Sequence, residues 1–177
     1  KCIWLLFRVA SKLTKDLKIP FKLEGITRID DTPVHKALRE ALANCLVNTD
    51  FFVPRGVVIK KEIDKIIIEN PGYIRTGKDQ MLKGGISDPR NKALMKMFNM
   101  LGIGERAGSG VPDIYHTWGS QGWLEPKVEE KYNPDRTILT LAFNLKNKDS
   151  KEGINDDIKD EIIDGWTILH EYRKNTS

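Results

Sequence analysis

The sequence predicts an α/β (α+β) two-layer sandwich, in which helices cover one face of a mixed β-sheet. Residues 34–48 carry apolar side chains at helical spacing, as in a helix that packs one face against a core. The isoleucine-rich runs 57–59 and 65–69 favour strands of a well-buried sheet. Residues 136–143 alternate between polar and apolar side chains, which is the pattern of a further strand.

The N-terminal segment, residues 2–18, predicts an amphipathic helix that packs against this domain. Its apolar side chains recur every three or four residues, at Ile3, Leu6, Phe7, Ala10, Leu13 and Leu17. Residues 21–25 then predict a short strand that ends at a glycine. The run Asp30-Asp31-Thr32-Pro33 predicts the start of the helix 34–48, because a capping residue precedes a proline in the first turn.

The middle of the chain joins these elements through breaks and one long polar stretch. Pro54 and Gly56 end the helical pattern, and residues 61–64 predict a turn between the two isoleucine-rich strands. Residues 70–90 are polar and rich in glycine, a length without periodicity that is usually a functional lid or a disordered segment. Residues 91–101 return to helical spacing, and the Gly-rich loop 102–110 opens a further helix at about residues 111–118.

Composition excludes several classes of protein. The formal net charge of +4 permits contact with a polyanion without requiring it. Two cysteines without a CxxC pair and three scattered histidines argue against a zinc site or a disulfide framework, and indicate a reducing cytoplasm. The apolar run 2–7 is too short to span a bilayer. Because the chain begins with Lys1 rather than Met, we expect it to be a fragment or a trimmed product.

One helical stripe carries a carboxylate and two amides. Glu40, Asn44 and Asn48 lie at i, i+4 and i+8, whereas Leu38, Leu42, Cys45 and Leu46 point into the core. An amide oxygen suits Mg²⁺, which prefers oxygen ligands, and a carboxylate can take a proton from an attacking water. The alternative is a solvated polar face.

Two Gly-containing turns accompany this stripe. Glu69-Asn70-Pro71-Gly72 follows a buried strand, where an amide or carboxylate can bind a purine edge; an ordinary turn is the alternative. Gly108-Ser109-Gly110 precedes a helix, whose unpaired N–H groups suit a phosphate; a flexible loop with a capping serine is the alternative. The sequence has no Gly-Lys-Ser/Thr P-loop and no Rossmann turn, which makes a helicase motor a poor interpretation.

In this order the three pieces resemble the GHKL (Bergerat) ATPases, which include gyrase B, MutL, sensor histidine kinases and the heat-shock chaperone. The sequence is most similar to the RecG-related subfamily, with the HATPase-like C-terminal region found in transcriptional regulators. The shared phrases span about residues 20–145 and are Leu38-Arg39-Glu40-Ala41-Leu42-Ala43-Asn44, Ile68-Glu69-Asn70-Pro71-Gly72, Gly84-Gly85-Ile86-Ser87-Asp88-Pro89-Arg90-Asn91, Gly104-Glu105-Arg106-Ala107-Gly108-Ser109-Gly110 and Asn133-Pro134-Asp135-Arg136-Thr137.

The resemblance implies ATP and Mg²⁺ as cofactors and a role for particular residues of the shared phrases. Glu40 resembles the general base and Asn44 the Mg²⁺ ligand, with Asn48 beside them. The other implied ATP contacts are Glu69, Asn70 and Gly72 near the adenine, Lys83, Gly85 and Arg90 in and beside a lid formed by residues 84–91, and Gly108, Ser109 and Gly110 at the phosphates. Asp88 and Pro89 also fit a simple cap of the following helix.

Three departures from the family leave its chemistry open. The usual Asp-x-Gly-x-Gly turn is here Glu69-Asn70-Pro71-Gly72-Tyr73, the usual His-x-Asp-Tyr is Asn48-Thr49-Asp50-Phe51, and the Gly-rich turn is shorter. The sequence fits ATP binding without turnover, and it also fits a weak ATPase. Hydrolysis needs a positioned water and charge stabilisation in addition to a base.

Two functions therefore follow from the sequence. One is an ATP-binding regulatory module of a DNA-associated bacterial protein, in which Mg-ATP binding is coupled to lid closure. The other is a degenerate GHKL scaffold that contacts DNA or protein without nucleotide. We expect a helical extension at 1–20, the ATP-binding domain at 21–145, and at 146–177 a charged linker followed by the start of a winged helix. DNA would be bound by flanking domains outside this chain; we expect no membrane contact and leave a homo-oligomer open.

Overall fold

The structure is a computed structural model that describes residues 2–15, 22–24, 27–29, 32–104 and 108–145. These residues form helices and strands in the order α1 (Cys2–Thr14), β1 (Lys22–Glu24), β2 (Thr27–Ile29), α2 (Pro33–Asn48), β3 (Val58–Lys61), β4 (Lys65–Pro71), α3 (Lys78–Lys83), α4 (Lys92–Asn99), α5 (Gly110–Ser120), β5 (Lys127–Lys131) and β6 (Arg136–Ala142). The charged linker and the winged-helix start predicted for 146–177 lie outside the described residues.

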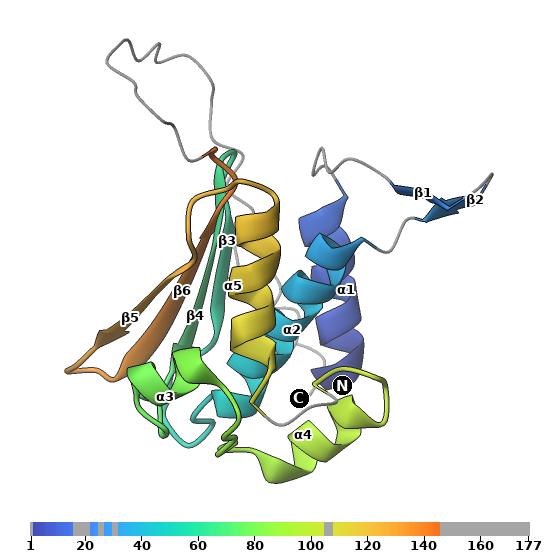
Figure 1. Cartoon of the computed structure of the whole chain (residues 1–177). Helices are drawn as coiled ribbons and strands as arrows, with labels where there is room; N and C mark the ends of the chain where they lie inside the picture. The colour runs from blue at the N-terminus through green and yellow to red at the C-terminus, as the bar shows by residue number, and fades with distance from the viewer. Residues whose placement is uncertain (1, 16–21, 25–26, 30–31, 105–107, 146–177) are drawn as a thin grey trace, which may run out of the picture.

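The larger sheet has the strand order β3-β4-β6-β5, and its helices lie on one face (Figure 1). This confirms the two-layer α/β sandwich. Every described pairing in this sheet is antiparallel, so the prediction of a mixed sheet, with both parallel and antiparallel pairs, was wrong. The reason is that β3 and β4, like β5 and β6, are neighbours joined by tight turns, which can link only antiparallel strands.

The helix α2 is the centre of the helical layer. It contacts α5, α1 and β4, and its buried side chains include Leu38, Leu42 and Cys45, as predicted. Its start also agrees with the sequence, because Pro33 occupies the first turn and the Thr32 amide donates to Nδ1 of His35 at 3.3 Å. Burial raises the pKa of the Cys45 thiol to about 12, in keeping with a core residue.

The core between the two layers is closed at one end by aromatic rings. Trp118 of α5 is fully buried, and its ring lies edge-on to Trp123 at 5.4 Å and tilted against Phe143 at 5.9 Å between centroids. Its indole Nε1 donates a hydrogen bond of 2.8 Å to the Ala142 carbonyl of β6. This bond ties α5 to the sheet at the end opposite α3 (Figure 1).

The helix α1 packs against α2, as we predicted for the N-terminal segment. Leu6, Ala10 and Leu13 enter the core, and Val9 joins them although the pattern did not include it. Phe7 is exposed, so its assignment to the apolar face was wrong. No helix among the described residues is long and apolar enough to cross a membrane.

Three short elements were not predicted. The strand β2 pairs with β1, and α3 interrupts the stretch 70–90 that appeared irregular. The strand β5 was taken for a polar loop, because it lies at the edge of the sheet and buries only Val128. An edge strand that is exposed on most sides leaves no apolar alternation in the sequence.

Candidate functional site

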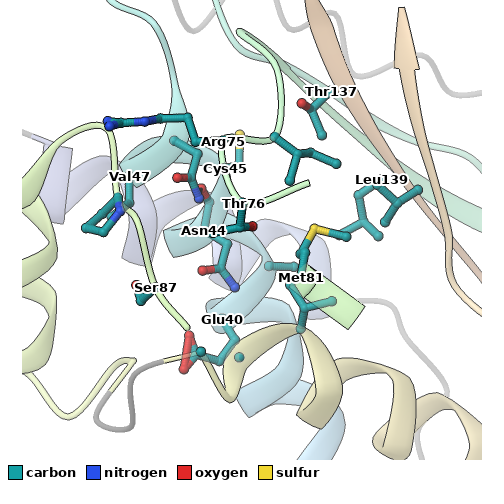
Figure 2. Close-up of a pocket in the computed structure, with 18 of the residues that line it drawn as sticks. Glu40, Asn44, Cys45, Val47, Arg75, Thr76, Met81, Ser87, Thr137 and Leu139 are labelled. Atoms are coloured by element: carbon teal, nitrogen blue, oxygen red, sulfur yellow. Dashed lines mark hydrogen bonds between the residues drawn. The ribbon is translucent and has the colours of Figure 1, made fainter. Parts of the chain in front are cut away.

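A cavity opens between α2, the start of α5, the end of β4 and residues 84–91, which we call the lid. It encloses about 1150 Å³ when its open mouth is included. Figure 2 shows Glu40 and Asn44 on α2, with Thr137 and Leu139 on the strand side. Six residues proposed from sequence line it: Glu40, Asn44, Asn48, Asn70, Gly108 and Gly110. The fold therefore brings the helical stripe, the strand-end turn and the Gly-rich turn 108–110 together.

Glu40 is half-buried and lines this cavity. Its Oε1 accepts a hydrogen bond of 2.8 Å from the Gly104 amide. Burial raises the pKa of the Glu40 carboxyl, the Gly104 hydrogen bond lowers it, and the negative charge of Asp113 raises it. The net effect is an elevated pKa, which favours a group that accepts or releases a proton.

This elevated pKa predicts a pH-dependent effect of Glu40→Gln on stability. The ordinary pKa of 4.5 applies to the unfolded chain, and the folded value lies above it. The folded state therefore favours the protonated form, and its advantage is lost as the pH rises from 4.5 through the folded pKa. A glutamine avoids that loss while its oxygen still accepts from Gly104.

We expect Glu40→Gln to unfold at a higher urea concentration than the wild type at pH 7, by a few tenths molar. The difference should vanish near pH 4, where both side chains are neutral. Urea titrations followed by circular dichroism at several pH values measure it. A wild type that is more stable than the variant at pH 7, but not at pH 4, would contradict the assignment of an elevated pKa.

Asn44 lies one helical turn beyond Glu40, beside the start of α5. Its Nδ2 is buried and has no hydrogen-bond partner among the described residues. A Cβ placed on Gly110 would lie 2.8 Å from this nitrogen and 3.5 Å from the Glu40 carboxylate. Only glycine therefore leaves this space between α2 and α5 open. A buried polar atom without a partner at such a place is expected to bind a ligand or water.

The strand-end turn is held by β6. Asn70 is buried, and its Nδ2 donates to the Pro71 carbonyl at 3.1 Å. Thr137 donates from Oγ1 to the Gly72 carbonyl at 2.8 Å and lines the same cavity. Thr137 was not selected from the sequence. It pairs with Asn70 in the register of β4 and β6, so both side chains lie on the face of the sheet that the helices cover.

The lid rests on the Gly-rich turn. The Gly85 amide donates to the Gly108 carbonyl at 3.3 Å, and a Cβ on Gly108 would lie 2.6 Å from the Gly85 nitrogen. At the other side of the cavity, Nε of Arg75 pairs with the Asp88 carboxylate at 3.0 Å. Both residues line the cavity; Asp88 belongs to the predicted lid, whereas Arg75 was not predicted. Their contact joins the loop after β4 to the lid.

The remaining proposed residues lie outside the cavity lining. They are Glu69, Gly72, Lys83, Gly85, Arg90 and Ser109. Glu69 alternates with Asn70 along β4, so it faces the other side of the sheet, where it pairs with Arg136 at 3.2 Å.

Arg90 is held by the protein itself. Its Nε donates to the Asn48 carbonyl at 3.2 Å, its Nη1 lies 3.9 Å from the Asp50 carboxylate, and its guanidinium lies over the Tyr73 ring. In this arrangement Arg90 connects the end of α2 to the strand-end turn, and it packs beside Gly72. Its predicted reach toward a phosphate would require these contacts to break.

The lining of the cavity offers one carboxylate and one amide on α2, at Glu40 and Asn44. Within the described part of the chain, no group of three or more His, Cys, Asp or Glu side chains is placed to hold a metal ion. Mg²⁺ commonly binds through one or two protein oxygens together with phosphate and water. Asn44 and Glu40 supply such oxygens beside the N-terminus of α5.

Part of this site lies in a segment with known relatives. Residues 55–141 match the family described as "Putative ATP-dependent DNA helicase recG C-terminal". This segment of the chain belongs to that family. The recG C-terminal segment includes the strand-end turn, the lid, the Gly-rich turn and β6, whereas α2 with Glu40 and Asn44 precedes it. No curated protein matches the chain.

The solved structures that are similar to the chain include one whose similarity extends beyond the recG C-terminal segment. It is the crystal structure of the DIP2311 protein from Corynebacterium diphtheriae, with a TM-score of 0.60 and 23% sequence identity. The similarity covers 80% of this chain and 29% of that protein. It supports the fold, and the chain spans less than a third of the length of that protein.

Proposed function

We propose that this chain is an ATP-binding regulatory module of a DNA-associated bacterial protein, in which Mg-ATP binding is coupled to the position of the lid. The observation that carries the proposal is the buried Asn44 Nδ2, which has no hydrogen-bond partner among the described residues and faces Gly110 at the start of α5, next to Glu40. The HATPase-like family of the segment 55–141 supports the same class of ligand.

The phosphate end of the nucleotide would lie between α2 and the Gly-rich turn. The first N–H groups of α5 have no partner within the helix, and the helix dipole favours an anion there. Asn44 would offer its amide to the cation or to a phosphate oxygen, and Glu40 would face the water next to the terminal phosphate. The bound Mg²⁺ supplies charge neutralisation for the phosphates.

The base would lie at the strand-end turn, between Asn70 and Thr137. Because the Asn70 nitrogen donates to Pro71, its oxygen is left to accept from an amino group. Ile68 and Leu139, which lie opposite each other on β4 and β6, add an apolar floor to this part of the cavity. An apolar floor with a few polar groups is typical of small-molecule sites.

Two of the contacts of the lid support its coupling to a bound ligand. The lid touches the Gly-rich turn through Gly85 and Gly108, and it touches the loop after β4 through Asp88 and Arg75. A ligand that contacts both the turn and the lid shifts the lid toward the arrangement it binds best. DNA contact is proposed for neighbouring domains, on the resemblance to transcriptional regulators and the family description alone.

Calorimetric titration with ATP and Mg²⁺ tests the proposal. We expect saturable binding with Kd on the order of micromolar, weakened at least about 100-fold in Asn44→Ala and in Gly110→Trp. Gly119→Trp and Asn144→Ala are matched controls, because a Cβ at Gly119 meets nothing within 4 Å and Asn144 is exposed beside Asp64. No binding by the folded wild type up to millimolar ATP would refute the nucleotide site and favour the scaffold that contacts DNA or protein directly.

A further inference from the structure

The last residue of α4 faces a loop that leads to Glu40. Three carbonyl oxygens surround the amide nitrogen of Asn99: Met95 at 3.2 Å, Ile103 at 3.1 Å and Gly104 at 2.8 Å. All three are acceptors, so the amide orients its nitrogen toward them and shares its two hydrogens among them. Asn99 therefore closes the tight turn between α4 and Gly104, although the residue as a whole is exposed.

The peptide group that joins Ile103 to Gly104 is held on both sides. Its carbonyl oxygen belongs to Ile103 and accepts from Asn99, while its N–H belongs to Gly104 and donates to Glu40 Oε1 at 2.8 Å. In a planar trans peptide the C=O and N–H point in opposite directions. Fixing the carbonyl therefore fixes the direction of the N–H.

The backbone of Gly104 allows this arrangement because it is glycine. Its φ of +72° is strained for other residues, and a Cβ would lie 3.2 Å from Met95 Cε. The carboxylate of Glu40 faces this peptide on one side and Gly110 on another, and Asp113 of α5 is the charged neighbour that acts on it.

We infer that Asn99 is a positioning residue for Glu40: it orients the Ile103–Gly104 peptide so that its N–H holds the Glu40 carboxylate at the cavity. Asn99 acts through this peptide and does not itself line the cavity. The consequence for hydrolysis rests on the proposed function, whereas the orientation of the peptide is independent of any ligand.

Nuclear magnetic resonance of the ¹⁵N-labelled chain tests the orientation directly, through the Gly104 amide. In Asn99→Ala we expect the protection of this amide against hydrogen exchange to fall about fivefold, the loss that one hydrogen bond implies. Glu40→Gln should shift the Gly104 resonance in the wild type but have little effect in Asn99→Ala, because the two substitutions act on one contact. Lys96→Ala, on an exposed position of α4, is the control.

Asn99→Ser keeps a donor of shorter reach and replaces the alanine variant if that variant does not fold. An unchanged Gly104 amide in a folded Asn99 variant, or fully additive effects of the two substitutions, would overturn the inference. The second readout is ATP turnover, for which we expect Asn99→Ala to lower kcat several-fold with an unchanged Kd for ATP. If ATP does not bind but the Gly104 amide responds as described, the positioning role stands and the proposed function fails.

Discussion

Replacing Gly108 by alanine should separate the lid from the Gly-rich turn. Gly108 has a φ of +73°, which costs an L-residue about 1–2 kcal/mol. Its new Cβ would also lie 2.6 Å from the Gly85 nitrogen and 2.7 Å from the Ile86 nitrogen. These are backbone atoms that cannot rotate away, so one of the two segments must move. We expect a total loss of about 3 kcal/mol and a lid that no longer contacts the turn.

Gly85→Ala is a matched control for this experiment. Gly85 has a similar φ of +80°, but a Cβ there meets nothing within 4 Å, so only the backbone strain remains. Hydrogen exchange of the lid amides and limited proteolysis at residues 84–91 measure the separation. Equal effects of the two substitutions would show that the contact between lid and turn contributes nothing.

The largest loss of stability should come from Trp118→Ala. The ring is fully buried against Trp123 and Phe143, and truncating a buried aromatic costs about 3–5 kcal/mol. The Ala142 carbonyl also loses its hydrogen bond from the indole, which ties α5 to β6. Urea denaturation measures the free energy of unfolding. The proposed nucleotide site should weaken too, because the first turn of α5 lines the cavity.

Two substitutions separate the components of this effect. Trp118→Phe keeps most of the ring but not the indole donor, and we expect it to cost about 1–2 kcal/mol. Trp4→Ala removes a ring that is 63% exposed and should change stability by less than about 0.5 kcal/mol. If Trp118→Ala behaved like Trp4→Ala, the aromatic cluster would not be part of the core that supports the site.

The parts of the fold that the sequence predicts are those with a strong local pattern. The helix α2 was expected at 34–48 and is found at Pro33–Asn48, since nearly every third or fourth residue on one face is buried. The two isoleucine-rich strands form the expected hairpin. The short helix α3 buries no residue and β5 buries one, so neither leaves a periodic signal that can be recognised in the sequence.

In the site, too, the residues predicted from sequence are those whose relation is local. Glu40 and Asn44 were predicted because their relation is local, one turn apart on one helix. Glu69 and Arg90 lie outside the cavity lining because their surroundings depend on distant residues: Arg136 pairs with Glu69, and Asp50 and the Asn48 carbonyl hold Arg90. Thr137 was missed for the same reason, since its hydrogen bond to Gly72 exists only when β6 lies beside β4.

The central pairing of β4 with β6 has a consequence for how the chain folds. The hairpins β3–β4 and β5–β6 join neighbouring residues, whereas pairing Pro71 with Arg136 closes a loop that contains α3, α4 and α5. Non-local pairings form late because the entropy of loop closure opposes them. We therefore expect the two hairpins to form first and their joining to limit the rate. Because Asn70 and Thr137 lie on the two sides of that seam, ligand-binding competence should appear only in the last step of folding.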